Sequence, residues 1–180
     1  MKPIGFWIAT WFGSGLLKGF LKIGGGTWGS IFALPLCYIL LKDVSGEPLG
    51  AKFFVWGAAL VVIFALGIES VPVAEGLLGE RPNWRGELKR HDQSEIVIDE
   101  VWGMLITCVP LLLLEFKSYW IALGLVLLFF RIFDMVKIPP TKYFDRNPKM
   151  ENAWGVMLDD GMAGIYAAIC VGLIIWLFKL

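Results

Sequence analysis

The sequence predicts an all-α fold: a polytopic membrane helix bundle of four long helices plus a shorter N-terminal helical segment. Three observations favour this class. Of the 180 residues, 57% are hydrophobic and only 18% are charged, whereas a soluble domain has about a quarter charged residues. Several long stretches contain almost no charge. Basic residues are also distributed unevenly among the segments that separate these stretches.

Four apolar stretches approach the length of a membrane-spanning helix, namely residues 53–70, 96–114, 118–136 and 154–178. A helix needs about 20 residues to cross the hydrocarbon core. A fifth, shorter apolar segment at 28–41 is either a short span or a re-entrant helix, and the sequence leaves both open. Because no linker or repeat divides the chain, we expect one membrane-embedded domain over residues 1–180.

Basic residues indicate the orientation of these spans. If residues 1–27, 71–95 and 137–153 share one side, that side holds 11 of the 16 lysines and arginines, and the other side holds 4. Basic residues accumulate on the cytoplasmic side of membrane proteins. We therefore expect a multi-pass protein of the cytoplasmic membrane with these three segments in the cytoplasm. This orientation requires an even number of crossings between residues 27 and 71.

Acidic residues recur near the expected cytoplasmic ends of three hydrophobic segments. They are Asp99 and Glu100 near the start of 96–114, Asp134 near the end of 118–136, Asp145 in the loop that follows, and Asp159 and Asp160 at the start of 154–178. An isolated acid inside a bilayer costs a few kcal/mol and is usually paired or functional. We therefore expect these carboxylates to gather in one polar cluster on the cytoplasmic side.

A divalent cation would balance this cluster better than the nearby basic residues Arg131, Lys137 and Arg146. Carboxylates favour hard ions such as Mg²⁺, which commonly bridge to phosphate. We predict Mg²⁺ as the cofactor, and the predicted metal ligands are Asp99, Glu100, Asp159 and Asp160. For any single acid, a helix cap or an ion pair is the competing interpretation, such as Arg131 with Asp134 at i+3.

A glycine-rich stretch, KIGGGTWGS, precedes the first apolar segment. Gly24, Gly26 and Gly29 match G-x-G-x-x-G, but no βαβ pattern surrounds them, so we exclude a dinucleotide site. Backbone N–H groups at a helix N-terminus can still bind phosphate, and we predict Gly26, Thr27 and Ser30 as substrate-binding residues. The alternative is an ordinary helix N-cap formed by Thr27 or Ser30.

The residues that other kinds of catalytic or metal site require are missing from this sequence. His91 is the only histidine, which excludes a histidine-rich metal site and leaves a Ser-His-Asp triad without a serine partner. Cys37, Cys108 and Cys170 lie in apolar segments without metal-ligand spacing, and we expect core residues without a disulfide. The net charge of zero gives no reason to expect nucleic acid. Gly161, Gly164, Ala168 and Gly172 form a small-residue stripe that favours close helix packing.

Several motifs together resemble the phosphatidylglycerophosphatase A family over nearly the whole chain. In order they are FGSG (12–15), GTWGS (26–30), EIVIDEVWGM (95–104), FRIFDMVKIPP (130–140), YFDR (143–146) and GVMLDDGMAG (155–164). Two positions depart from the family pattern: Gly25 replaces a proline, and residues 151–154 replace a Gly-Gly pair. Both departures leave the acids intact.

The resemblance implies an integral-membrane, Mg²⁺-dependent phosphatase of bacterial phospholipid synthesis that acts on phosphatidylglycerophosphate. Together with the distribution of basic residues, it predicts an enzyme of the bacterial inner membrane with its active site facing the cytoplasm. It places the family's functional positions on the six acids above and on Arg131, Lys137 and Arg146. We assign transition-state stabilisation to the three basic residues, with Lys137 and Arg146 also binding phosphate. Asp134 or Asp145 is the candidate general base. Water attack and an aspartyl-phosphate intermediate both stay open.

Two other classes of protein compete with this interpretation. A phosphatidyltransferase would need a D-x-x-D-G-x-x-A-R pattern, which this sequence lacks. An acid-lined cation or proton transporter is the alternative function, although a transporter should place its acids near the bilayer midplane. Beyond the lipid substrate and the bilayer, we infer no obligate protein partner.

Overall fold

The computed structural model describes residues 2–82, 88–89, 93–136, 139 and 152–179. Helices make up most of this part of the chain. Their order is α1 (Ile4–Ala9), the 3₁₀ turns η1 (Ser14–Leu17) and η2 (Phe20–Lys22), α2 (Gly25–Asp43), α3 (Leu49–Leu78), α4 (Ile98–Thr107), the 3₁₀ turn η3 (Val109–Leu112), α5 (Tyr119–Val136) and α7 (Ala153–Phe178). Between α3 and α4 lie two antiparallel two-residue strands, β1 (Arg81–Pro82) and β2 (Leu88–Lys89). The predicted all-α class is confirmed.

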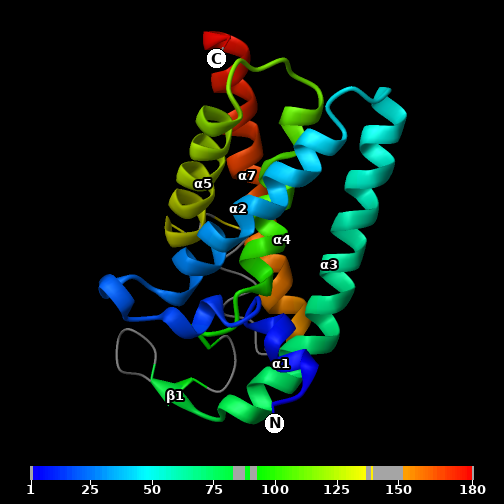
Figure 1. The fold of residues 1–180 in the computed structure, drawn as a ribbon. Helices are drawn as coiled ribbons and strands as arrows, with labels where there is room; N and C mark the ends of the chain where they lie inside the picture. Colours follow the sequence, from blue (N-terminus) through cyan, green and yellow to red (C-terminus); the bar gives the residue numbers. More distant parts are fainter. Residues whose placement is uncertain (1, 83–87, 90–92, 137–138, 140–151, 180) are drawn as a thin grey trace.

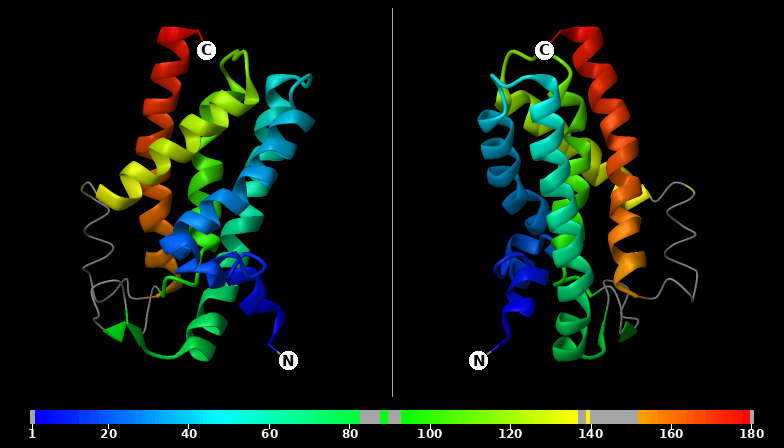
Figure 2. Two further views of the ribbon diagram at one scale, coloured as in Figure 1. Left: turned by 60° about the vertical axis from the view of Figure 1, so that its left-hand side comes forward. Right: turned by 90° about the vertical axis from the view of Figure 1, so that its right-hand side faces the viewer.

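The long helices alternate in direction along the length of the molecule, with α2 and α5 tilted against the others (Figures 1 and 2). α2, α4 and α7 rise from the lower half of the view, whereas α3 and α5 return toward it (Figures 1 and 2). The N-terminus, the end of α3 and the start of α7 share the lower end, and the C-terminus lies at the upper end. The segments 1–27 and 71–82 therefore lie at the same end, as the distribution of basic residues predicts.

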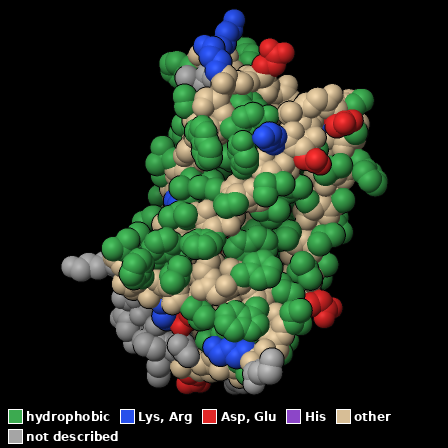
Figure 3. Space-filling model, in the orientation of Figure 1, with side chains coloured by type: hydrophobic (Ala, Val, Ile, Leu, Met, Phe, Trp, Pro, Cys, Tyr) green, Lys and Arg blue, Asp and Glu red, His purple; other side chains and the backbone are tan. Residues whose placement is uncertain are grey.

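Three helices are long and apolar enough to cross a membrane: α3, α5 and α7. They correspond to the expected spans 53–70, 118–136 and 154–178. Large hydrophobic side chains on their outer faces are exposed, among them Phe54, Trp120 and Trp176. On the face shown in Figure 3, the described charged side chains gather toward the two ends, and a broad hydrophobic band covers the middle. This pattern is typical of a surface that faces lipid.

The expected span over 96–114 is divided in the structure. Its α-helical part, α4, ends at Thr107, and a 3₁₀ turn containing Pro110 follows. Proline lacks the N–H that would continue the helix. Ten helical residues give about 15 Å, too short for a span. α4 is instead the central helix, with Ile98, Val101 and Met104 fully buried among α2, α3, α5 and α7.

The segment 28–41 lies within the 19-residue helix α2. At 1.5 Å per residue, this helix is about 28 Å long. It continues in one direction to the upper end, where it connects to α3 (Figure 1). α2 is not among the described helices that are both long and apolar enough to cross a membrane. A crossing by 28–41, which the predicted orientation requires, stays a prediction.

Small residues allow α4 and α7 to pack closely. A Cβ at Gly161 would overlap the ring of Trp102, and one at Gly164 would overlap the backbone of Gly103. The hydroxyl of Thr107 donates hydrogen bonds to the carbonyl oxygens of Gly103 at 2.8 Å and Gly164 at 3.4 Å. The packing role predicted for the glycine stripe is therefore confirmed. The close approach brings the acidic ends of the two helices together.

Candidate active site

Asp99 and Glu100 occupy the first turn of α4, where the helix dipole favours negative charge. The chain leading into this turn is anchored to the N-terminal region. The amide of Val97 donates a hydrogen bond to the carbonyl of Ala9 at 2.9 Å, and the buried carboxylate of Glu95 pairs with the ammonium of Lys18 at 2.6 Å. These contacts fix where α4 begins and thus where its two acids lie.

Asp160 on α7 faces these two acids. Ligand oxygens of Asp99, Glu100 and Asp160 all lie within 4.8 Å of one another. Asp99 and Asp160 are buried, and Oδ2 of Asp160 accepts no hydrogen bond from any residue that the structure describes. The side chain of Asn152 caps α7 by accepting hydrogen bonds from the amides of Trp154 at 2.9 Å and Gly155 at 3.2 Å. Asn152 belongs to residues 151–154, which depart from the family pattern, and it fixes the start of α7.

Asp159 is the fourth predicted metal ligand. It is not one of the three carboxylates that share the 4.8 Å cluster, although it lies close enough to interact electrostatically with Asp160. Adjacent residues on a helix point about 100° apart, so Asp159 and Asp160 face different neighbours. Its role as a metal ligand stays a prediction.

α5 contributes Arg131 and Asp134 to the same region. The guanidinium of Arg131 lies 2.8 Å from the carboxylate of Asp134, so the i,i+3 ion pair offered as a competing interpretation is formed. The same guanidinium donates a long hydrogen bond of 3.5 Å to the hydroxyl of Ser30. Both Arg131 and Asp134 interact electrostatically with Asp160. The pair therefore lies beside the carboxylate cluster and belongs to the same polar region.

The N-terminus of α2 completes this region. A Cβ at Gly26 would overlap a carboxylate oxygen of Glu100 and come within 3.2 Å of the guanidinium of Arg131. The helix is preceded by Gly24 as its N-cap residue, without a side-chain cap. A cap by Thr27 or Ser30 is thus wrong, because both lie inside the helix; the Ser30 hydroxyl donates a hydrogen bond back to the carbonyl of Gly26 at 2.9 Å. The first amides of α2 lack partners within the helix.

The structure thus brings together eight of the predicted site residues from four helices. They are Gly26 and Ser30 on α2, Asp99 and Glu100 on α4, Arg131 and Asp134 on α5, and Asp159 and Asp160 on α7. Thr27 lies next to Gly26 in the first turn of α2. Lys137, Asp145 and Arg146 lie outside the described residues. Sequence reasoning missed the Lys18–Glu95 pair. Glu95 begins the motif 95–104, but Lys18 is far away in the chain and no motif connects the two residues.

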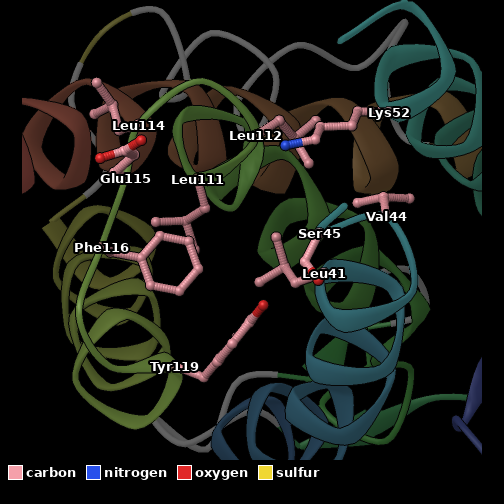
Figure 4. A pocket seen from close by; sticks show the side chains of 10 residues that line it. All are labelled: Leu41, Val44, Ser45, Lys52, Leu111, Leu112, Leu114, Glu115, Phe116 and Tyr119. Atoms are coloured by element: carbon pink, nitrogen blue, oxygen red, sulfur yellow. The ribbon is translucent and has the colours of Figure 1, made fainter. Parts of the chain in front are cut away.

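A separate pocket of about 370 Å³ lies between the end of α2, η3 and the start of α5 (Figure 4). Its walls are mostly apolar, with Leu111, Phe116 and Tyr119 among them, and Lys52 and Glu115 add charge. None of the predicted site residues lines it. It is distinct from the carboxylate cluster.

Three helices of spanning length and a buried carboxylate cluster define a polytopic membrane protein with an acidic site near the helix ends of one side. Comparison with known proteins identifies its family. Residues 7–175 match phosphatidylglycerophosphatase A, and the chain belongs to this family. The resemblance seen in the motifs is therefore confirmed, and the chain is a phosphatase.

The curated relatives agree on the enzyme class. Phosphatidylglycerophosphatase A of Haemophilus influenzae is 36% identical over 164 residues, which cover 91% of this chain and 84% of the relative. The Escherichia coli protein of that name is 34% identical over 161 residues, covering 89% and 77%. A Bacteroides thetaiotaomicron relative, 34% identical over 170 residues and 91% of each chain, is named provisionally as a phosphatidylinositol-3-phosphatase. No solved structure matches the chain significantly.

Proposed function

We propose that this protein hydrolyses phosphatidylglycerophosphate to phosphatidylglycerol and phosphate, with Mg²⁺ as cofactor, at the cytoplasmic face of the bacterial inner membrane. The names of two relatives support the substrate. The observation that carries the chemistry is the cluster of Asp99, Glu100 and Asp160 within 4.8 Å, next to Arg131 and the N-terminus of α2.

The donor set fits a Mg²⁺ ion. Carboxylate oxygens are the ligands that hard divalent cations prefer, and an ion of this kind keeps waters that can be exchanged for phosphate oxygens. Oδ2 of Asp160 is buried and accepts no hydrogen bond from the described residues, which leaves it available to a cation. Asp99, Glu100 and Asp160 would hold the ion, with Asp159 as a further candidate ligand. When bound, Mg²⁺ neutralises phosphate oxygens and polarises water.

Positive groups surround the place where a phosphate would lie. The first amides of α2, which have no partners within the helix, and the dipole of this helix favour an anion. The guanidinium of Arg131 points toward the same helix turn. We assign to it the stabilisation of the negative charge that develops on the phosphoryl oxygens. Lys137 and Arg146 are proposed to share this role from the connection between α5 and α7.

The reaction begins with attack of water on phosphorus. The bond between phosphorus and the glycerol oxygen breaks, and that oxygen takes up the proton that the base removed from the attacking water, which gives the free hydroxyl of phosphatidylglycerol. Asp134 is the candidate base within the described residues that takes the proton of the attacking water, because it lies beside Asp160 and its orientation is fixed by Arg131. Asp145 is the second candidate. An aspartyl-phosphate intermediate is the competing route, and acid quenching of a single turnover with labelled substrate distinguishes the two.

The proposed orientation of the protein in the membrane rests on the distribution of its lysines and arginines. The end of the molecule that carries the carboxylate cluster also carries the N-terminal segment and the end of α3, which belong to the lysine- and arginine-rich set. A lipid could keep its acyl chains in the inner leaflet while its head group reaches the cluster.

Phosphate release by the purified full-length protein tests this function. We expect release from phosphatidylglycerophosphate with Mg²⁺, none with EDTA, and recovery when Mg²⁺ is restored. Asp160→Asn and Asp99→Asn should each lower the rate by a factor of at least about 10³, comparable to the loss of an essential electrostatic group. Glu115→Gln, at the far pocket, is the matched control. Near-normal rates in folded Asp160→Asn protein would refute the assignment.

Phosphatidylinositol-3-phosphate is the informative competing substrate, because one relative carries that name. We expect a higher kcat/KM for phosphatidylglycerophosphate. The reverse ranking would reject the proposed substrate while leaving the phosphatase class intact.

A further inference from the structure

Residues 11–22 form an irregular segment on the side of the bundle, which we call the turn segment. It contains η1 and η2 and lies beside the start of α2, just below the level at which α5 ends (Figures 1 and 2). The catalytic proposal above uses none of these residues.

The turn segment exposes large hydrophobic side chains. Phe12 is 74% exposed, Phe20 60% and Leu21 69%. Two of these residues have left-handed backbone conformations, with φ of 56° at Phe12 and 55° at Leu21. Bulky residues rarely adopt this conformation, and it usually persists where function requires it. The segment therefore exposes apolar side chains, and it does so in a backbone conformation that these residue types do not favour.

The backbone of this segment restricts what can cover those side chains. Short 3₁₀ turns leave N–H and C=O groups that the hydrocarbon core cannot satisfy, so lipid-exposed irregular backbone does not occur at that depth. Exposed Phe and Leu side chains are, however, unfavourable in water. The boundary between head groups and acyl chains satisfies both requirements, because polar backbone meets water there while apolar side chains reach lipid.

A row of aromatic rings connects the segment to the exposed side of α2 at Phe32. The ring of Phe20 lies 5.9 Å from that of Trp28, which lies 6.2 Å from that of Phe32. The indole of Trp11 donates a hydrogen bond to the carbonyl of Phe32 at 3.0 Å. Tryptophan side chains favour the membrane interface. Trp28 lies in the first turn of α2, as does Gly26, so the row passes the end of the helix whose Gly26 borders the carboxylate cluster.

From these contacts we propose that the turn segment inserts Phe12, Phe20 and Leu21 into the leaflet that supplies the lipid substrate, and that it forms the edge over which the phosphate head group reaches the cluster. The partner surface is the phospholipid interface itself. The role in substrate access rests on the proposed function, whereas the position in the membrane does not.

Depth measurements test the position. In a Cys170→Ser background, where the remaining cysteines Cys37 and Cys108 are buried, spin labels at Phe20→Cys or Leu21→Cys would be compared in vesicles of phosphatidylethanolamine and phosphatidylglycerol. We expect high oxygen and low aqueous-nickel accessibility, similar to a label at Leu128→Cys on the exposed side of α5. A label at Ser45→Cys, between α2 and α3, gives the aqueous reference. Nickel accessibility equal to that at Ser45 would overturn the proposal.

Kinetics test the role in access. The double variant Phe20→Ser with Leu21→Ser should lose roughly tenfold or more in rate on long-chain substrate in vesicles, because both side chains lose their lipid contacts. Its rate on a water-soluble, short-chain phosphomonoester analogue should equal that of the wild type. Leu113→Ser, an exposed apolar residue between η3 and α5, is the matched control. Equal losses on both substrates, or no loss on either, would overturn the access role. Wild-type protein inactive on both substrates would instead refute the proposed function, and the depth measurement would still decide the position.

Discussion

The backbone of Gly26 lies directly against the carboxylate of Glu100, with no room for a Cβ between them. This contact joins the N-terminus of α2, which favours anions, to the first turn of α4, which supplies two of the clustered acids. Both helices depend on the chain segment 93–97, because a Cβ at Gly25 would overlap the backbone of Ser94 and one at Gly29 would overlap Val97. The relative position of the proposed phosphate site and the proposed metal site is thus set by glycine contacts.

Gly26→Ala should therefore lower activity without unfolding the protein. The new methyl group must displace the Glu100 side chain, and misplacement of a site group by about 1 Å can cost roughly 10²-fold in rate. We expect a loss of that size in kcat and a higher Mg²⁺ requirement. Gly57→Ala on α3, where a Cβ meets no atom within 4 Å, should leave activity unchanged. Full activity of Gly26→Ala would show that the close contact has no role in the site.

Arg131→Lys tests whether the guanidinium acts on the phosphoryl group or only pairs with Asp134. Lysine keeps the charge but cannot make the forked contacts of arginine. If Arg131 stabilises the transition state, kcat should fall by roughly 10²-fold or more with little change in KM. Asp134→Asn, measured with and without Arg131→Lys, supplies the double-mutant cycle. Strictly additive losses would argue against coupling through the 2.8 Å ion pair.

The spans and the gathering of acids could be predicted from sequence because each depends on a local property. Uninterrupted apolar length marks α3, α5 and α7, and an acid inside such a stretch needs partners at the same depth. The division of 96–114 was missed because Pro110 lies within a continuous apolar run. Hydropathy does not register that a proline interrupts the backbone hydrogen bonds.

Contacts between distant segments could not be predicted. Lys18 and Glu95 look like ordinary surface charges in the sequence, yet the carboxylate of Glu95 is buried against η1. The start of α2 was also missed by a few residues, because Thr27 and Ser30 are common N-cap residues. Here tertiary contacts of Gly25 and Gly29 with 94–97 determine the start of the helix instead.

Lys18→Met should destabilise the protein by roughly 2–3 kcal/mol, less than the 3–5 typical of a fully buried pair, because the lysine side chain is one-third exposed. The reason is that the buried Glu95 carboxylate loses its charged partner. The double variant Lys18→Met with Glu95→Met should recover part of this loss. Thermal unfolding of the two variants in detergent gives the comparison. A single variant as stable as the wild type would show that the pair contributes little.

Asp160→Asn should change stability in opposite directions with and without Mg²⁺. Without a cation, Asp160 lies near the carboxylates of Asp134, Glu100 and Asp159, and among the described residues Arg131 is the one that offsets their repulsion. Asparagine removes one negative charge from this group, so in EDTA the variant should unfold at or above the wild-type temperature. A cation that binds the folded state stabilises it by about 2.7 kcal/mol at one hundred times its dissociation constant. The wild type should therefore become the more stable protein once Mg²⁺ is added.

This reversal in the order of stability between variant and wild type distinguishes a metal site from a purely structural cluster. If the three acids served only to hold α4 and α7 together through buried hydrogen bonds, Asp160→Asn would destabilise the protein under both conditions. If Mg²⁺ bound elsewhere, it would raise the unfolding temperatures of the variant and the wild type equally. Glu115→Gln, distant from the cluster, should respond to Mg²⁺ as the wild type does. The prediction requires no turnover, so it tests the metal ligands even if the lipid substrate proves to be different.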